Sequence, residues 1–138
     1  AGRHWKCVLR EGENQLKAVA VKSKEAISDE ITVAYQTAQW GEPKQLKLTS
    51  YPEGENIIRV EAQLTDDKGI PCLDAANLIS FEAAGDGELI QNLGTSTGSR
   101  KVQAYNGKAM IRVKVTDPCY LSVQSDGIKT AYTQLKAQ

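Results

Sequence analysis

The sequence has little of what enzyme chemistry most often uses. It contains one histidine, His4, and three cysteines, Cys7, Cys72 and Cys119, among 138 residues. Catalysis through a Ser–His or Cys–His pair would depend on His4, which lies near the N-terminus, where chains commonly fray. The cysteines form no CxxC pair, which argues against a structural zinc site. We therefore predict no catalytic residue, no metal ligand and no cofactor.

An excess of charge of one sign is also lacking, as is any long apolar run. The 17 Lys and Arg residues balance the 17 Asp and Glu residues, and no basic cluster is larger than Arg100 with Lys101. This removes the basic surface that nucleic-acid binding requires. No apolar run approaches the roughly 18 residues that suggest a transmembrane helix. We expect neither nucleic acid nor a membrane as a partner.

Each cysteine lies in or beside an apolar strand pattern, which favours a buried thiol that packs as a small apolar side chain. The odd number leaves at least one cysteine unpaired. A disulfide between Cys72 and Cys119 stays open, because the sequence does not say whether their Cα atoms come within bonding reach.

The dominant pattern is an alternation of apolar and polar residues, interrupted by turn residues about every ten positions. No apolar stripe with the period of a helix accompanies it, so we predict an all-β chain. Near the N-terminus we expect three strands, at residues 5–9, 16–21 and 31–35, with a turn at 11–14.

Residues 39–43 interrupt this pattern with Gly41 and Pro43 and are predicted to be a short linker. Residues 44–138 then offer about seven short strands, which is typical of an immunoglobulin-like antiparallel β-sandwich. Turns are expected at 66–69, 85–87, 106–107 and 126–127. The strands are expected around 46–48, 58–64, 79–83, 102–105, 109–115, 120–124 and 130–135.

Three strands in residues 1–38 cannot close a sandwich by themselves. We predict that these residues are the C-terminal half of a preceding β-sandwich domain. Their edges and apolar face should be covered by sequence outside the chain, by residues 44–138 or by another copy of the chain, so we also expect self-association through residues 1–38. The start at Ala1, without an initiator Met or leader, suggests a piece of a longer protein.

Turn residues supply the remaining candidates for catalysis or ion binding. Paired carboxylates can cleave glycosidic bonds, and carboxylates near glycine can bind calcium. In turns, however, such residues normally serve solvation and local hydrogen bonding, and neither the 66–69 nor the 85–88 segment has the ligand spacing of a calcium loop. Residues 94–101 lack the GxxxxGK[ST] phosphate loop. The carboxylate pairs considered are Glu53/Glu55, Asp66/Asp67 and Asp86/Glu88.

Aromatic residues offer one further route to function, since exposed rings stack on the apolar faces of sugars while nearby polar groups bond the hydroxyls. Tyr105, Tyr120 and Arg100 are the candidates for glycan contact. For most of the two Trp, five Tyr and one Phe, packing in a core or an interface is the favoured interpretation. Trp40 in particular is expected to pack between the two parts of the chain.

A set of short motifs is spread along most of the chain. They are Trp5-Lys6-Cys7-Val8-Leu9, Glu11-Gly12-Glu13-Asn14, Trp40-Gly41-Glu42-Pro43, Phe81-Glu82, Gly85-Asp86-Gly87-Glu88, Asn92-Leu93-Gly94-Thr95 and Tyr105-Asn106-Gly107-Lys108-Ala109. Together they resemble the C-terminal immunoglobulin-like accessory region of bacterial family 2 glycoside hydrolases of the β-galactosidase-like type. The resemblance implies a non-catalytic fragment of an exo-glycosidase that removes β-linked galactose or a related sugar. The catalytic glutamates of this family lie on an upstream barrel, which at about 250 residues is too large for this chain.

Three functions stay in view from the sequence. The first is packing as an accessory part of such a hydrolase, with the upstream barrel as its partner. The second is a carbohydrate-binding module, and the third is a bacterial adhesin repeat, which Asp74-Ala75 and Gly85-Asp86-Gly87 support. The family resemblance also implies a periplasmic or extracellular location.

Overall fold

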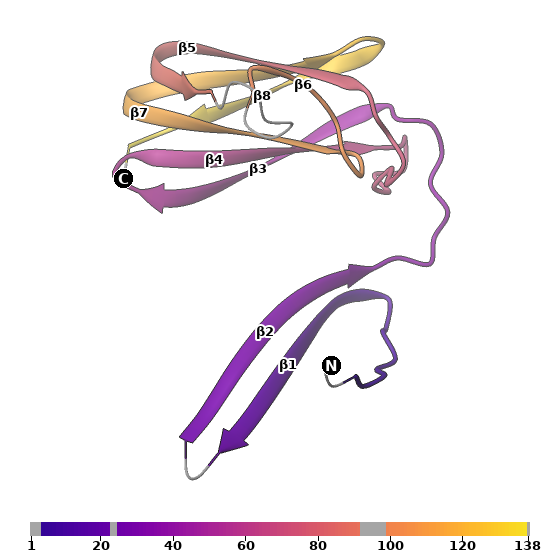
Figure 1. The fold of residues 1–138 in the computed structure, drawn as a ribbon. Helices are drawn as coiled ribbons and strands as arrows, with labels where there is room; N and C mark the ends of the chain where they lie inside the picture. The colour runs from indigo at the N-terminus through magenta and orange to yellow at the C-terminus, as the bar shows by residue number, and fades with distance from the viewer. Residues whose placement is uncertain (1–3, 23–24, 92–98, 138) are drawn as a thin grey trace. The chain divides into compact units, whose positions relative to one another are not determined.

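The computed structural model describes residues 4–22, 25–91 and 99–137. Every regular element in these residues is a β-strand, and all strand pairs are antiparallel, which confirms the predicted all-β class. The chain divides into two compact units, residues 1–39 and residues 40–138, called the first and the second unit below (Figure 1).

The first unit is a two-stranded ribbon. β1 (Gly12–Lys22) pairs with β2 (Glu25–Tyr35) in an unbroken register. Gly12, at φ 96°, begins the ribbon in a conformation that favours glycine. The side chain of Asn14 fastens the preceding turn, because it accepts a hydrogen bond from the Arg10 N–H (2.9 Å) and donates one to the Arg10 carbonyl (2.7 Å).

The strand predicted at residues 5–9 is wrong, because residues 4–10 form no strand. Their alternation fits a strand, but a strand also needs a neighbour with which to form hydrogen bonds, and β1 pairs only with β2 among the described residues. The other two predicted strands are present and longer than expected. The predicted turn at 11–14 is also displaced, since residues 12–14 already belong to β1.

The described residues of the second unit form six strands. They are β3 (Gln45–Gly54), β4 (Ile57–Thr65), β5 (Leu78–Ile90), β6 (Lys101–Gln103), β7 (Lys108–Ser125) and β8 (Ile128–Leu135). Their hydrogen-bonded order is β3-β4-β7-β5-β6, and β8 also pairs with β7.

The sheet folds into the two layers of a sandwich because its two longest strands, β5 and β7, each run through both layers. The first half of β7 pairs with β4, and its second half pairs with β8. β5 runs beside both halves, with a shift of register between Gly85 and Gly87, where residues 116–118 of β7 lie opposite one residue of β5. β3 and β8 contact each other at the open side. Figure 1 shows β3 and β4 together on one side of the unit.

Two sequence predictions are corrected here. Residues 85–87 are not a turn but a bulge inside β5, although Gly85 does take the expected positive φ, at 92°. Residues 109–115 and 120–124 are not separate strands but one strand, so the part of the unit that the structure describes has six strands instead of about seven. Pro118 lies at the bulge, where its missing N–H breaks no ladder bond. The turns at 66–69, 106–107 and 126–127 are confirmed.

The core of the second unit is filled from alternate positions of β4, β5 and β7. Phe81 is the largest side chain that is fully buried, and Leu64, Ile79, Ile111 and Leu121 are also inaccessible to solvent. Trp40, Leu46, Leu48, Ala83, Leu89 and Ile128 pack around this core while keeping some exposure. A single continuous core of this kind gives the second unit its own source of stability.

Asp66 anchors the start of the second unit. Its side chain is buried and accepts three backbone hydrogen bonds, from the N–H groups of Gly41 (3.0 Å), Lys68 (2.9 Å) and Ile70 (2.8 Å). These bonds, that from Gly41 foremost, hold the pKa of the Asp66 carboxyl below its usual value. The carboxylate therefore ties residue 41 of the predicted linker to the 66–70 turn.

Candidate functional site

The described residues contain no group of three or more His, Cys, Asp or Glu side chains arranged to hold a metal ion. They also contain no helix that is long and apolar enough to span a membrane. The three cysteines are free thiols, so the pairing of Cys72 with Cys119 does not occur. Both of these thiols are buried, as expected, and burial raises the pKa of each. Cys7 is exposed, which corrects the prediction for that residue.

Trp40 lies against the core of the second unit and is only partly exposed. Its indole N–H donates a hydrogen bond to the Asp74 carboxylate at 2.5 Å. The next residue is held as well, because the Cys72 thiol donates to the Gly41 carbonyl at 3.4 Å, in addition to the bond between Gly41 and Asp66. Trp40 is thus a fixed part of the second unit, and a contact with the first unit stays a prediction.

The carboxylate pairs are dispersed. Glu53 on β3 accepts from Arg112 (2.6 Å) and Arg59 (3.1 Å), and its bond with Arg112 is the main reason why the pKa of its carboxyl is lowered. Arg59 also pairs with Glu61 (2.6 Å) and lies 4.5 Å from the centre of the Tyr51 ring. A lowered pKa suits an ion pair and opposes the role of a general acid.

The structure separates Tyr105 from the other two glycan candidates. Tyr105 is exposed and flanks the turn before β7, close to Asn77, where β5 is about to begin. Tyr120 lies opposite Ala84, near the middle of β5. Tyr105 and Tyr120 therefore stand apart along β5 and cannot share one small ligand.

Arg100 and Tyr120, by contrast, lie on the same outer face. Cys119, Leu121 and Val123 point into the core, so the alternation of β7 turns Tyr120 and Ser122 outward. Ser122 lies opposite Glu82 of β5, which forms an ion pair with Arg100 at 3.5 Å. On the other side of β7, Ser122 lies opposite Tyr132 and Tyr120 lies opposite Gln134.

We call this surface the tyrosine face. It consists of Glu82, Arg100, Tyr120, Ser122, Tyr132 and Gln134. Tyr132 and Gln134 were not among the candidates predicted from the sequence. The alternation of β8 toward the buried Leu135 marks them as outward, but only the register between β7 and β8 places them beside Tyr120.

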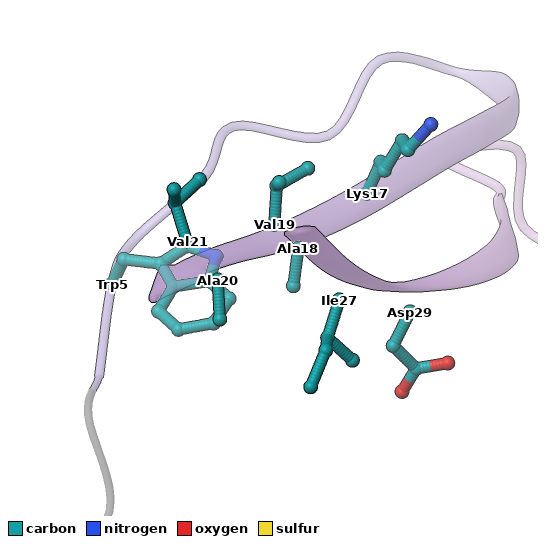
Figure 2. A pocket seen from close by; sticks show the side chains of 8 residues that line it. All are labelled: Trp5, Lys17, Ala18, Val19, Ala20, Val21, Ile27 and Asp29. Atoms are coloured by element: carbon teal, nitrogen blue, oxygen red, sulfur yellow. The ribbon is translucent and has the colours of Figure 1, made fainter. Parts of the chain in front are cut away.

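A second exposed surface lies on the ribbon of the first unit. Trp5, Val19, Val21 and Ile27 are between 57% and 75% exposed. Figure 2 shows Val19 and Val21 on one side of the ribbon and Ala18, Ala20 and Ile27 on the other, with the Trp5 ring beside them. They line an open hollow of about 850 Å³. Apolar side chains on both faces, with both strand edges unpaired among the described residues, are unusual for a free surface.

Comparison with known proteins shows what the chain is similar to. The profile of the family "Glycoside hydrolase family 2 C-terminal domain 5" matches residues 47–134. A Formosa agariphila protein named as a β-glucuronidase is 31% identical over 140 residues, which cover 99% of this chain and 17% of that protein.

Solved structures give the same result. A Parabacteroides merdae β-glucuronidase is 47% identical, with a TM-score of 0.83, and the match covers 96% of this chain and 17% of the other. The Bacteroides uniformis β-glucuronidase 3 is 38% identical, with a TM-score of 0.81, and the match covers 94% of this chain and 17% of the other. The chain thus spans about a sixth of the length of these relatives.

Proposed function

Because the chain belongs to glycoside hydrolase family 2, as a C-terminal accessory region outside the catalytic barrel, we propose that it serves a longer enzyme that hydrolyses β-glucuronides. The observation that carries this proposal is the 47% identity over 96% of the chain with a β-glucuronidase. The sequence motifs resemble the β-galactosidase-like type of the same family, whereas the most similar proteins described above are named for β-glucuronides. We therefore favour a glucuronide as the substrate of the longer enzyme.

The role proposed for this region is packing and support. The second unit offers one continuous core, and two of the candidate carboxylates have structural roles, Glu53 in an ion pair and Asp66 in a turn. The adhesin alternative depended partly on Gly85-Asp86-Gly87, which here forms the bend of β5. A periplasmic or extracellular location is also proposed, on the family resemblance alone.

The test compares the longer protein with the 138-residue chain on nitrophenyl β-glucuronide and nitrophenyl β-galactoside. We expect the longer protein to hydrolyse the glucuronide faster than the galactoside, and the 138-residue chain to hydrolyse neither. Preference of the longer protein for the galactoside would overturn the proposed substrate. Hydrolysis by the 138-residue chain would overturn the accessory role.

For the first unit, we propose that residues upstream of this chain cover the β1–β2 ribbon in the longer enzyme. Two observations support this: Val21 and Ile27 are exposed, and no strand among residues 4–22, 25–91 and 99–137 pairs with the outer edges of the ribbon. Without that cover, the 138-residue chain is expected to self-associate as its concentration rises, because burying each apolar side chain contributes about 1.5–3 kcal/mol. Sedimentation velocity of the chain over a range of concentrations measures this.

The variant Val21→Lys/Ile27→Lys should shift the chain toward monomer, because charge on both faces opposes burial. Gln15→Lys is the matched control, since it adds a charge at an exposed polar position of the same ribbon. A wild-type chain that stays monomeric at every concentration would refute self-association through residues 1–38.

A further inference from the structure

Two exposed tyrosines stand next to each other on the tyrosine face. Tyr120 is 56% exposed and Tyr132 is 71% exposed. Tyr120 lies opposite Gln134, and Tyr132 lies opposite Ser122. The two tyrosines therefore occupy diagonal positions on the adjacent strands β7 and β8, and residues at such diagonal positions are about 7–8 Å apart. One ligand a few rings long can therefore touch both.

Their backbone support is rigid. The second half of β7 is hydrogen-bonded on both sides, to β5 and to β8, and its inward side chains Cys119, Leu121 and Val123 are fully buried. Tyrosine has few rotatable bonds and presents an apolar ring with a polar hydroxyl. Rings on such a support lose little conformational entropy when a ligand binds.

Apart from Ala84 opposite Tyr120, the cross-strand neighbours of the two rings are polar. Ser122 on β7 lies between Glu82 on β5 and Tyr132 on β8, and Glu82 forms an ion pair with Arg100. One row across the three strands therefore presents a charged pair, a hydroxyl and an aromatic ring. Gln134 lies beside Tyr120. Carboxylate, guanidinium, hydroxyl and amide groups are the donors and acceptors that bond sugar hydroxyls.

A polar hollow continues the same face. Ser80 lies opposite both Gln124 of β7 and Lys101 of β6, which places these side chains one row away from Glu82 and Ser122. With Leu78, Ser125 and Asp126 they line a hollow of about 210 Å³. The face therefore offers an aromatic pair and, next to it, a polar depression.

We propose that the tyrosine face binds an extended oligosaccharide, with successive sugar rings stacked on Tyr120 and Tyr132 and the chain continuing toward the hollow at Ser80. A protein partner fits less well, because the centre of a protein interface is depleted of Glu, Lys and Ser, whereas Glu82 and Ser122 lie in one row with Tyr132 and Lys101 lies at the hollow. The inference goes beyond the proposed function, since it requires no catalysis.

The experiment is calorimetric titration of the 138-residue chain with two tetrasaccharides, one from hyaluronan, which contains glucuronate, and cellotetraose, which does not. We expect saturable binding of at least one of them with Kd below about 1 mM. The variant Tyr120→Ala/Tyr132→Ala should weaken this binding at least tenfold, whereas Tyr120→Phe/Tyr132→Phe should retain most of it, because the stacking rings remain.

Tyr105→Ala is the matched control, because it removes a tyrosine outside the face that is more exposed than either Tyr120 or Tyr132. It should leave the affinity unchanged, and the melting temperatures of all variants should stay close to that of the wild type. The proposal is overturned if neither tetrasaccharide binds, if the double alanine variant binds as the wild type does, or if Tyr105→Ala weakens binding equally. Glucuronide hydrolysis by the longer protein is measured separately, so failure here leaves the proposed function intact.

Discussion

Gly107→Ala is expected to destabilise the second unit by about 4 kcal/mol, whereas Gly127→Ala is expected to cost about 1–2 kcal/mol. Both glycines occupy two-residue turns and have almost the same φ, 71° and 72°. Alanine at either position carries the same left-handed strain. The contrast between the two substitutions therefore comes chiefly from what the new methyl group meets.

At Gly127 a Cβ would have no heavy atom within 4 Å, apart from its immediate neighbours in the chain. At Gly107 it would overlap the carbonyl oxygen of Cys72 and lie 2.9 Å from Nε2 of Gln63. Cys72 cannot retreat easily, since it is fully buried and its N–H bonds the Leu64 carbonyl at 2.9 Å. Relief of the overlap would instead break the bonds that Gly107 makes with Leu64 (2.8 Å) and Ala75 (3.1 Å).

Urea unfolding measures both changes. Fluorescence of Trp40 reports on the second unit alone if the exposed Trp5 is first replaced by Phe. The midpoint of Gly107→Ala should fall far below that of Gly127→Ala, with similar slopes. An equal loss of stability in the two variants would contradict this prediction, because it would mean that the 106–107 turn can move away from Cys72 at little cost.

The turns were predictable from the sequence because their chemistry is local. Asn106-Gly107 and Asp126-Gly127 both mark two-residue hairpin turns, and the structure has a turn at each. The bulge between β5 and β7 was not predictable in the same way. In the sequence, Gly85 and Pro118 each predict the end of a strand. The structure has a bulge within continuous strands at these residues, and this depends on how β5 pairs with β7.

The candidate site shows the same division. The alternation of β7 predicts that Tyr120 points outward, but its neighbours come from residues distant in sequence. Arg100 meets Glu82 across 18 positions, and Trp40 meets Asp74 across 34 positions. The register of β8 against β7 adds Tyr132. Residue types and spacing cannot supply such contacts, because they depend on which strands become neighbours.

Phe81→Ala is expected to destabilise the second unit by about 3–5 kcal/mol, because it removes a fully buried ring from the core. Domains of this size are commonly stable by only about 5–15 kcal/mol, so the variant should be near its limit. Urea unfolding of the 138-residue chain measures the loss. Tyr105→Ala, which truncates an exposed ring, should change stability by no more than about 0.5 kcal/mol.

In the longer enzyme the same substitution separates support from catalysis. Since the proposed role of this region is packing, Phe81→Ala should shorten the half-life at elevated temperature while the initial kcat of the folded enzyme stays within about twofold of the wild type. Circular dichroism at the assay temperature establishes that the variant is folded. A kcat lost while the fold persists would contradict a purely supporting role, because the second unit would then help to hold the active site in its working geometry.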